Sequence, residues 1–302
     1  MSIPIINHSD YVAQIGDDHR FPIKKFGELI KLLKKQNIAT DKNTFRPNEV
    51  SIPTLLNIHT KDYVDKINTL SLNKDEIRKL GFPLVESVRR RSFVATGGTV
   101  LASKLALKNK LACNTAGGSH HAFANQGNGY CVFNDVAVAA KNLQQNCNIK
   151  NILIFDLDVH QGDGTAKIFE HDEEIFTVSV HSKKNYPSKK QVSNLDLELE
   201  DNTRDEEYLN IVNNLLNKVN QMKFDFVFYV AGVDIHENDR LGKLKITEDG
   251  VKKREELVIK NFFKKSVPLC GVLGGGYNKN FEQLVRLHSL LHSTCKEVSE
   301  AC

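Results

Sequence analysis

The segment Ile152-Leu-Ile-Phe-Asp-Leu-Asp-Val-His-Gln-Gly-Asp-Gly164 is the most informative part of the sequence. Its first half is a continuous apolar run, which is typical of a strand whose two faces are both covered by helices. Alternate residues of an extended backbone share a face, so Asp156, Asp158 and His160 would point the same way. Three polar groups on one face of a buried strand are unfavourable unless they pair or bind a cation. The pattern therefore predicts a metal site at a strand end, although Asp158 and His160 alone would fit a structural hydrogen-bonded pair equally well.

Comparable apolar runs recur along the chain and alternate with amphipathic segments. The predicted strands are Leu111–Thr115, Asn151–Asp156, Ile175–Val180, Phe224–Ala231 and Val267–Leu273. Helical spacing of apolar residues predicts helices over Ile23–Lys35, Pro83–Lys108, Asn134–Gln145, Asp205–Met222, Thr247–Lys264 and Asn280–Ser293. Thr247 is the expected N-cap of its helix because Glu248 and Asp249 follow in the first turn. Alternating strands and helices indicate βαβ units, and hence an α/β fold with a mainly parallel sheet.

Composition excludes several classes of protein. The chain has 302 residues, and 41 Lys+Arg against 37 Asp+Glu give a formal net charge of +4. This small surplus does not indicate a nucleic-acid-binding protein. Arg89–Arg91 form the tightest basic cluster, and a solvated helix face explains them better than a polyanion site. Four more lysines flank Tyr186-Pro187, namely Lys183, Lys184, Lys189 and Lys190. No Pro/Gly/Ser linker interrupts the chain, so we expect a single domain that spans residues 1–302.

The cysteines and the N-terminal segment indicate a reducing compartment. The six cysteines show no C-x-x-C spacing, so neither a disulfide framework nor a cysteine-based zinc site is expected. Residues 1–10 lack the pattern of a secretory signal, and no apolar run approaches the length of a membrane span. We therefore expect a cytoplasmic protein, with nuclear or host-directed action left open.

Unusual polar residues follow the predicted strands. His120-His121 come after the run at 111–115, Asp234 after that at 224–231, and Tyr277 after that at 267–273. Open parallel sheets place their sites at the carboxyl ends of the strands, so these groups should share one crevice. Asp234 is the best third ligand beside Asp158 and His160, and three ligands leave an open position, as in catalytic zinc sites. Standing alone, Asp234 would be read as a turn or N-cap residue.

The remaining polar groups suggest acid–base chemistry. If Asp158 binds metal, Asp156 and Asp163 are free to accept a proton from His120 or His121, which fixes the tautomer of the imidazole. His121 could then act as general base and acid, with His120 as the companion charge. Adjacent histidines without such partners would be ordinary surface residues.

Two aromatic segments complete the predicted site. Gly274-Gly275-Gly276-Tyr277 does not match a phosphate loop, and it would instead let the backbone approach closely while the Tyr277 hydroxyl faces a developing oxyanion. A packing tyrosine after a glycine turn is the alternative. Tyr130 in Gly129-Tyr130-Cys131 and Tyr186 could wall a narrow channel, although each alone would be an ordinary loop residue.

Taken together, five motifs resemble those of the zinc-dependent histone deacetylase family. They are G-G-S-H-H at 117–121, G-Y-C at 129–131, D-L-D-V-H-Q-G-D-G at 156–164, A-G-V-D at 231–234 and G-G-G-Y at 274–277. The resemblance covers roughly residues 15–295, and segments such as Asp239-Arg240-Leu241-Gly242 look closest to class IV members and their bacterial relatives. It implies a single domain of three-layer, arginase-like α/β fold, with a central sheet of about eight mainly parallel strands.

The resemblance also implies roles for individual residues. Asp158, His160 and Asp234 match the Zn²⁺ ligands, and His120 and His121 match the tandem histidines paired with Asp156 and Asp163. Tyr277 matches the tyrosine that polarises the substrate carbonyl. Gly129 matches the acceptor of the substrate amide N–H, Tyr130 and Tyr186 match the channel walls, and Leu241 lies near the rim. A structural K⁺ beneath the zinc is implied at Asp156, Asp158, His160, Ser179 and Val180.

The implied reaction is hydrolysis of an acyl group, most simply acetyl, from lysine side chains of a peptide or protein, including a histone. Long fatty acyl groups and small acyl amines remain alternatives, and Leu241 disfavours a free polyamine because polyamine-selective relatives carry a Glu near the rim. A two-manganese ureohydrolase would need more bridging carboxylates, since His236 stands where another acid would be required. An inactive acyl-lysine binding module is the alternative from a different class. His236 itself is either an extra ligand or a loop residue.

Overall fold

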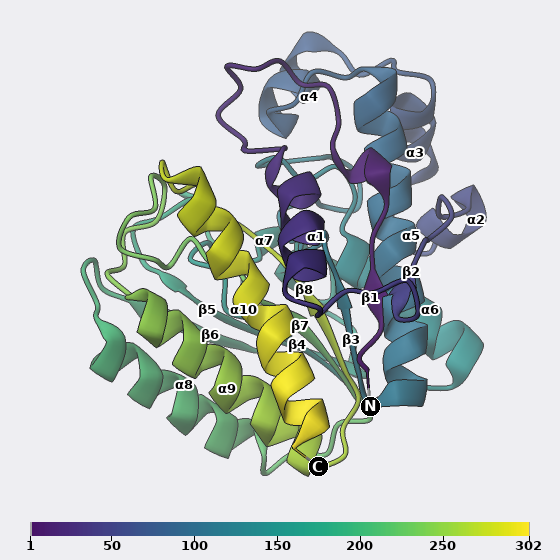
Figure 1. Cartoon of the computed structure of the whole chain (residues 1–302). Coiled ribbons are helices and arrows are strands. Elements are labelled where there is room, and N and C mark those ends of the chain that lie inside the picture. Colours follow the sequence, from purple (N-terminus) through teal and green to yellow (C-terminus); the bar gives the residue numbers. More distant parts are fainter. Residues whose placement is uncertain (1, 302) are drawn as a thin grey trace.

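One fully parallel sheet runs through the part of the chain that the computed structural model describes, residues 2–301 (Figure 1). Its eight strands lie in the order β2-β1-β3-β8-β7-β4-β5-β6. They are β1 (Ile5–Ile6), β2 (Thr44–Phe45), β3 (Leu111–Asn114), β4 (Ile152–Asp156), β5 (Ile175–Ser182), β6 (Leu195–Leu199), β7 (Phe226–Val230) and β8 (Leu269–Val272). The predicted α/β fold with a mainly parallel sheet of about eight strands is confirmed.

Helices cover both faces of this sheet, so the fold has three layers (Figure 1). One layer holds α1 (Lys25–Lys35), α8 (Asp205–Val219), α9 (Glu248–Lys264) and α10 (Phe281–Glu300). The opposite layer holds α5 (Glu86–Asn109) and α6 (Asp135–Cys147). The shorter helices are η1 (Ser9–Tyr11), α2 (Ile52–Leu55), α3 (Lys61–Asn68), α4 (Lys74–Leu80) and α7 (Asp163–Ile168).

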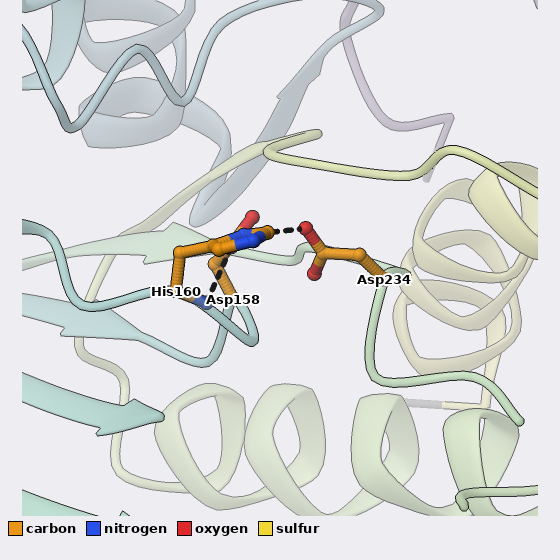
Figure 2. A group of neighbouring side chains, drawn as sticks. All are labelled: Asp158, His160 and Asp234. Atoms are coloured by element: carbon orange, nitrogen blue, oxygen red, sulfur yellow. Dashed lines mark hydrogen bonds and ion pairs between the residues drawn. The ribbon is translucent and has the colours of Figure 1, made fainter. Parts of the chain in front are cut away.

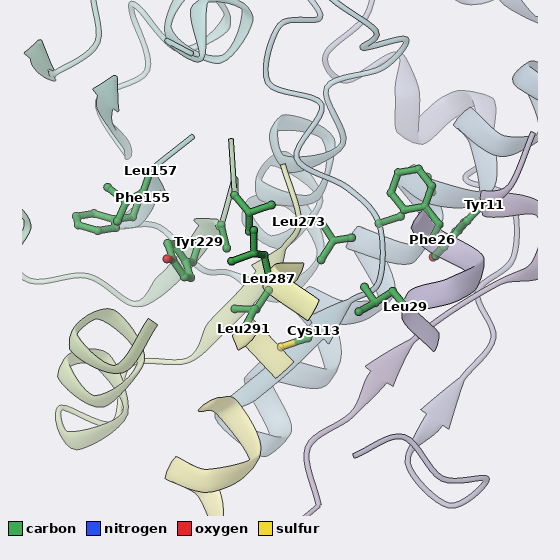
Figure 3. Close-up of a cluster of buried hydrophobic side chains, with 14 of the residues drawn as sticks. Tyr11, Phe26, Leu29, Cys113, Phe155, Leu157, Tyr229, Leu273, Leu287 and Leu291 are labelled. Carbon is green, nitrogen blue, oxygen red and sulfur yellow. The ribbon is translucent and has the colours of Figure 1, made fainter. Parts of the chain in front are cut away.

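Two apolar cores explain why the strand sequences are continuously hydrophobic. Phe155 of β4 belongs, with Tyr229, Leu287 and Leu291, to the core under α1, α8, α9 and α10 (Figure 3). Ile154, its neighbour in β4, belongs to the second core, under α5 and α6. Successive side chains of a strand point to opposite faces, so a strand covered on both sides needs apolar residues at every position.

Some elements were absent from the sequence prediction. The edge strand β6 reads Leu-Asp-Leu-Glu-Leu and is half exposed, so it lacks a continuous apolar run. The strands β1 and β2 have two residues each, too few for any periodic pattern. The strand predicted at Asn151–Asp156 ends at Asp156 as expected, but the extended backbone assumed from Asp156 to His160 is absent, because the chain bends after Asp156. The Thr247 N-cap is confirmed, since its hydroxyl accepts the Gly250 N–H at 3.1 Å.

The helices and cysteines add two further facts. No helix among residues 2–301 is long and apolar enough to cross a membrane. The cysteines of the described part are free thiols, namely Cys113, Cys131, Cys147, Cys270 and Cys295. Cys302 lies outside the described residues.

Candidate active site

Side chains that follow four different strands meet at the carboxyl edge of the sheet. His120 and His121 follow β3, Asp158 and His160 follow β4, Asp234 follows β7, and Tyr277 follows β8. Parallel strands place their carboxyl ends on one edge, so the connections can bring distant residues together. The structure thus gathers in one place the groups that the sequence predicts to share a crevice.

Asp158, His160 and Asp234 form a buried cluster (Figure 2). The Nδ1 atom of His160 lies 3.1 Å from Oδ1 of Asp158 and 3.1 Å from Oδ2 of Asp234. One potential ligand atom of each residue lies within 4.8 Å of the other two. The three predicted metal ligands are therefore close enough for one small ion to contact all of them.

Backbone hydrogen bonds hold the bend that carries this cluster. Asp156 Oδ1 accepts the N–H of Asp158 at 3.0 Å, and Asp158 Oδ1 accepts the N–H of His160 at 2.9 Å. Asp234 Oδ1 accepts the N–H of Val159 at 3.0 Å, which ties the loop after β7 to the loop after β4. Each carboxylate keeps a second oxygen for another partner.

Gly275 shows why a glycine run follows β8. Its N–H donates to Oδ2 of Asp158 at 2.6 Å. A Cβ at this position would lie 1.9 Å from Oδ2 of Asp234 and 2.8 Å from Oδ2 of Asp158. Only glycine leaves the space between the two carboxylates open, which agrees with the close backbone approach predicted for Gly274-Gly275-Gly276.

The electrostatics of the cluster favour a cation. Burial and the nearby Asp158 charge raise the pKa of Asp234 to about 7. Burial acts to lower the pKa of His160, but hydrogen bonds to both acids raise it to about 10. Two buried acids facing one another are unfavourable without positive charge. The cluster thus fits a divalent metal in donor chemistry, with two carboxylates and one imidazole, as well as in the open space that Gly275 preserves.

His120 is paired with the carboxylate that ends β4. Its Nδ1 lies 2.6 Å from Oδ2 of Asp156, so Asp156 is turned toward the histidine rather than toward His160. Burial disfavours the imidazolium, but the charges of Asp156 and Asp158 outweigh it and raise the pKa of His120 to about 9. The expectation that Asp156, Asp158 and His160 share one face is therefore wrong for Asp156, because the chain bends directly after it.

His121 forms the second histidine–carboxylate pair. Its Nδ1 lies 2.6 Å from Oδ1 of Asp163, the first residue of α7. Burial and the neighbouring charge of His120 lower the pKa of His121 to about 4. His121 is therefore neutral near pH 7, with Nδ1 held by the acid and Nε2 on the opposite side of the ring.

The turn before the histidines is fixed by Asp135, a residue that the sequence analysis missed. Its Oδ1 accepts the N–H of Ser119 at 2.7 Å, and its Oδ2 accepts the N–H of Gly118 at 3.2 Å and the hydroxyl of Thr99 at 2.5 Å. A carboxylate directly after an N-cap was the signal available in the sequence.

A pocket of about 540 Å³ leads from the surface to these groups. Gly129, Tyr130, Tyr186, Leu241 and Tyr277 line it, together with His121 and His160 at its inner end. The Tyr186 ring stands edge-on to His121, with 4.9 Å between ring centroids. All four predicted substrate-binding residues thus border one pocket.

Tyr277 is positioned by two residues that the sequence analysis left without a role. Its N–H donates to Oδ2 of Asp239 at 2.6 Å, and its carbonyl accepts Nε of Arg240 at 2.7 Å. Burial holds the pKa of the Tyr277 phenol well above its ordinary value, so the hydroxyl stays protonated and can donate. The loop after β7, which carries Asp234, therefore also holds the tyrosine.

Two further residues, His236 and Ser179, were considered as possible ion ligands. His236 is outside the cluster, and its Nδ1 accepts the N–H of Asn238 at 3.1 Å within the loop. Ser179, predicted beside a second ion, pairs in register with Asp156 across β4 and β5.

Comparison with known proteins identifies the family. Residues 19–291 match the histone deacetylase domain, and the chain belongs to that family of hydrolases. An uncharacterized protein of Picosynechococcus is 44% identical over 299 residues, covering 99% of this chain and 100% of that protein. Histone deacetylase 2 of Arabidopsis thaliana is 28% identical, covering 94% of this chain and 76% of that protein. The acetoin utilization protein AcuC of Staphylococcus aureus is also 28% identical, covering 90% and 76%.

Solved structures agree on the fold. The crystal structure of a histone deacetylase homolog from Aquifex aeolicus has a TM-score of 0.82 at 24% identity, covering 100% of this chain and 89% of that one. The family resemblance predicted from the five motifs is confirmed, as is the arginase-like three-layer fold.

Proposed function

We propose that this protein is a zinc-dependent hydrolase that removes acyl groups, most simply acetyl, from lysine side chains. One observation carries the proposal: two histidine–aspartate pairs and Tyr277 surround the buried cluster of Asp158, His160 and Asp234 at the inner end of one pocket. Zn²⁺ held by these three ligands would polarise the acyl carbonyl and lower the pKa of a water.

His121 is the proposed general base and acid. Asp163 accepts the Nδ1 proton, which leaves Nε2 of His121 unprotonated and able to take a proton from the attacking water. The same Nε2 proton then passes to the departing lysine amine. His120, held protonated by Asp156, contributes the neighbouring positive charge.

Tyr277 and the pocket walls act on the substrate itself. The Tyr277 hydroxyl donates to the oxygen of the acyl group as negative charge develops on it. The carbonyl of Gly129 accepts the amide N–H of the acyl-lysine, while the rings of Tyr130 and Tyr186 enclose the alkyl chain. Leu241 lies at the outer end.

The test is a panel of acetyl-, butyryl- and myristoyl-lysine peptides and an acetylated small amine, assayed with zinc-loaded and with chelated protein. Cleavage of acetyl-lysine that disappears on chelation supports the proposal. Preference for the myristoyl peptide or for the small amine would favour the alternative substrates, which are long-chain acyl-lysines and small acyl amines. No cleavage by zinc-loaded protein would contradict it.

Metal stoichiometry separates this proposal from a two-manganese ureohydrolase. Among the described residues, Asp158, His160 and Asp234 are the group of acidic and imidazole side chains that meets the spacing for a metal ion. We expect one tightly bound divalent ion per chain. A second ion of equal affinity would favour the ureohydrolase, and tight acetyl-lysine binding without cleavage would favour an inactive binding module.

Several finer assignments stay predictions. They are the class IV relationship, the potassium ion near Ser179 and Val180, the extension of one catalytic domain over residues 1–302, and the cytoplasmic location.

A further inference from the structure

The outer end of the pocket is lined by cations and by no acid. Its charged lining residues, the histidines aside, are Arg78, Lys79, Lys184 and Lys243, and all four are exposed. We call these four residues the rim. Neither Asp nor Glu is among the described residues that line this pocket. The chain as a whole has a net charge of only +4, so the rim concentrates positive charge at one point.

One half of the rim is tied to the wall of the pocket. Arg78 and Lys79 lie in the last turn of α4, which Gly81 ends in a left-handed conformation. The carbonyl of Lys79 accepts the N–H of Gly129 at 3.2 Å, and the next carbonyl accepts the N–H of Tyr130 at 2.8 Å. These bonds fix the backbone that carries Arg78 and Lys79 beside the proposed substrate-binding residues Gly129 and Tyr130.

The other half is held by a buried amide. Nδ2 of Asn185 donates to the carbonyl of Leu241 at 2.5 Å, and Oδ1 accepts the N–H of Lys243 at 3.1 Å. The ammonium of Lys243 donates to the carbonyl of Lys184 at 3.0 Å. The loop after β5 and the loop after β7 thus present Lys184 and Lys243 side by side.

Neighbouring acids neutralise this charge only weakly. Arg78 pairs with Asp75 at 3.2 Å, but both side chains are about four-fifths exposed. Lys184 lies 4.0 Å from Glu200, again in solvent. Solvated pairs of this kind are weak and exchange readily. Neither Asp75 nor Glu200 lines the pocket itself, so an incoming ligand meets the cations first.

Resting on the proposed acyl-lysine hydrolysis, we propose that the preferred substrate is an acyl-lysine flanked by Asp or Glu in an extended peptide segment. With the acyl-lysine in the pocket, residues one to three positions away lie within about 10 Å of it, at roughly 3.3 Å per residue. Acidic flanks then face the rim within one Debye length. Lysine-rich tails, including those of histones, are repelled by the same four charges.

The experiment compares three acetyl-lysine peptides of equal length with acidic, neutral or basic flanks. We expect kcat/KM on zinc-loaded protein to fall in the order acidic, neutral, basic, with about tenfold between the extremes in dilute buffer. Because the effect is electrostatic, the ratio should shrink as salt rises from about 25 mM to about 300 mM. Equal kcat/KM for the three peptides would overturn the proposal.

Charge reversals locate the effect. The double variants R78E/K79E and K184E/K243E should each reduce the acidic-to-basic ratio severalfold, and the quadruple variant should invert it. The matched control is K252E/K253E, which reverses two exposed charges on α9 and should keep the ratio. A full acidic preference in the rim variants would contradict the assignment.

Binding separates this inference from the hydrolysis proposal. The same peptides, fluorescently labelled, are titrated into the Tyr277→Phe protein, and dissociation constants are read by anisotropy. If zinc-loaded wild-type protein cleaves no peptide, but the Tyr277→Phe protein binds the acidic one most tightly, the hydrolysis proposal fails and the rim proposal stands. If the three peptides bind with equal affinity and a single-stranded oligonucleotide binds tightly, the rim proposal is wrong. The rim would then be a binding site for polyanions.

Discussion

His121 and Asp163 face each other with 2.6 Å between Nδ1 and Oδ1, and both are buried. The acid is the first residue of α7, whereas the imidazole lies in the connection from β3 to α6. A carboxylate at this distance accepts a hydrogen bond from a protonated Nδ1, which leaves Nε2 as the nitrogen of His121 that we propose takes a proton from water.

Asp163→Asn should lower kcat on an acetyl-lysine peptide by about 10²-fold or more, because the amide does not hold the productive tautomer of His121. Zinc content and melting temperature should change little. Turnover within a few-fold of wild type would exclude the role of Asp163. The companion variant His121→Ala should lose at least as much activity.

Tyr277→Phe should reduce kcat by about 10²- to 10³-fold, which is typical when one donor to an oxyanion is removed. The hydroxyl acts on charge that appears only in the transition state, so KM should change far less than kcat. Steady-state kinetics on the acetyl-lysine peptide measure both. A rise in KM with unchanged kcat would make Tyr277 a packing residue.

Gly275→Ala should weaken metal binding although it removes no ligand. Its Cβ would lie 1.9 Å from Oδ2 of Asp234, so the carboxylate must move. Asp158→Asn should lose the metal outright. Metal analysis after dialysis against a zinc buffer measures both variants, with Asp62→Asn on α3 as the surface control. A full equivalent of tightly held zinc in Asp158→Asn would refute the ligand set.

Stability should fall as pH decreases below about 6.5. Burial is the main reason that the pKa of His59 falls from 6.5 to about 4, and its Nε2 accepts the N–H of Asn134 at 3.1 Å. Between pH 6.5 and pH 4, His59 is protonated in the unfolded chain but not in the folded chain. His59 therefore contributes stability above pH 6.5 that is lost as the pH falls toward 4. The full difference is about 3 kcal/mol.

Urea unfolding between pH 4 and 7 measures this slope. His59→Gln should flatten the dependence of the free energy of unfolding on pH, whatever its effect on absolute stability. The control is His171→Gln, where the side chain is 89% exposed. A slope that His59→Gln leaves unchanged would show that other buried groups carry the acid sensitivity.

The central strands could be predicted because burial on both faces leaves a plain signature. Ile152 to Phe155 are all apolar, and so are the five residues of β7. The strand β6 lies at the edge of the sheet and carries Asp196 and Glu198. Because it is partly exposed to solvent, it lacks the continuous apolar run by which a strand is recognised in the sequence. A long apolar run therefore identified the middle of the sheet but not its border.

The proposed chemical groups were visible in the sequence, whereas most of their supports were not. His121 and Asp163 stand in motifs that can be read locally. Asp135 and Asp239 act by accepting backbone N–H groups of distant turns, and an acid in such a role looks like any other loop acid. Asn185 is similar, since its two contacts lie in a loop more than fifty residues away.

The hydrogen bond from Gly275 to Asp158 joins positions 117 residues apart, and the strand order β8-β7-β4 is what makes it short. During synthesis the chain emerges from its N-terminus, so Asp158, His160 and Asp234 are all made before the segment that closes around them. The proposed metal site around Asp158 therefore stays incomplete until the segment with Gly275, just before the last helix, has been made.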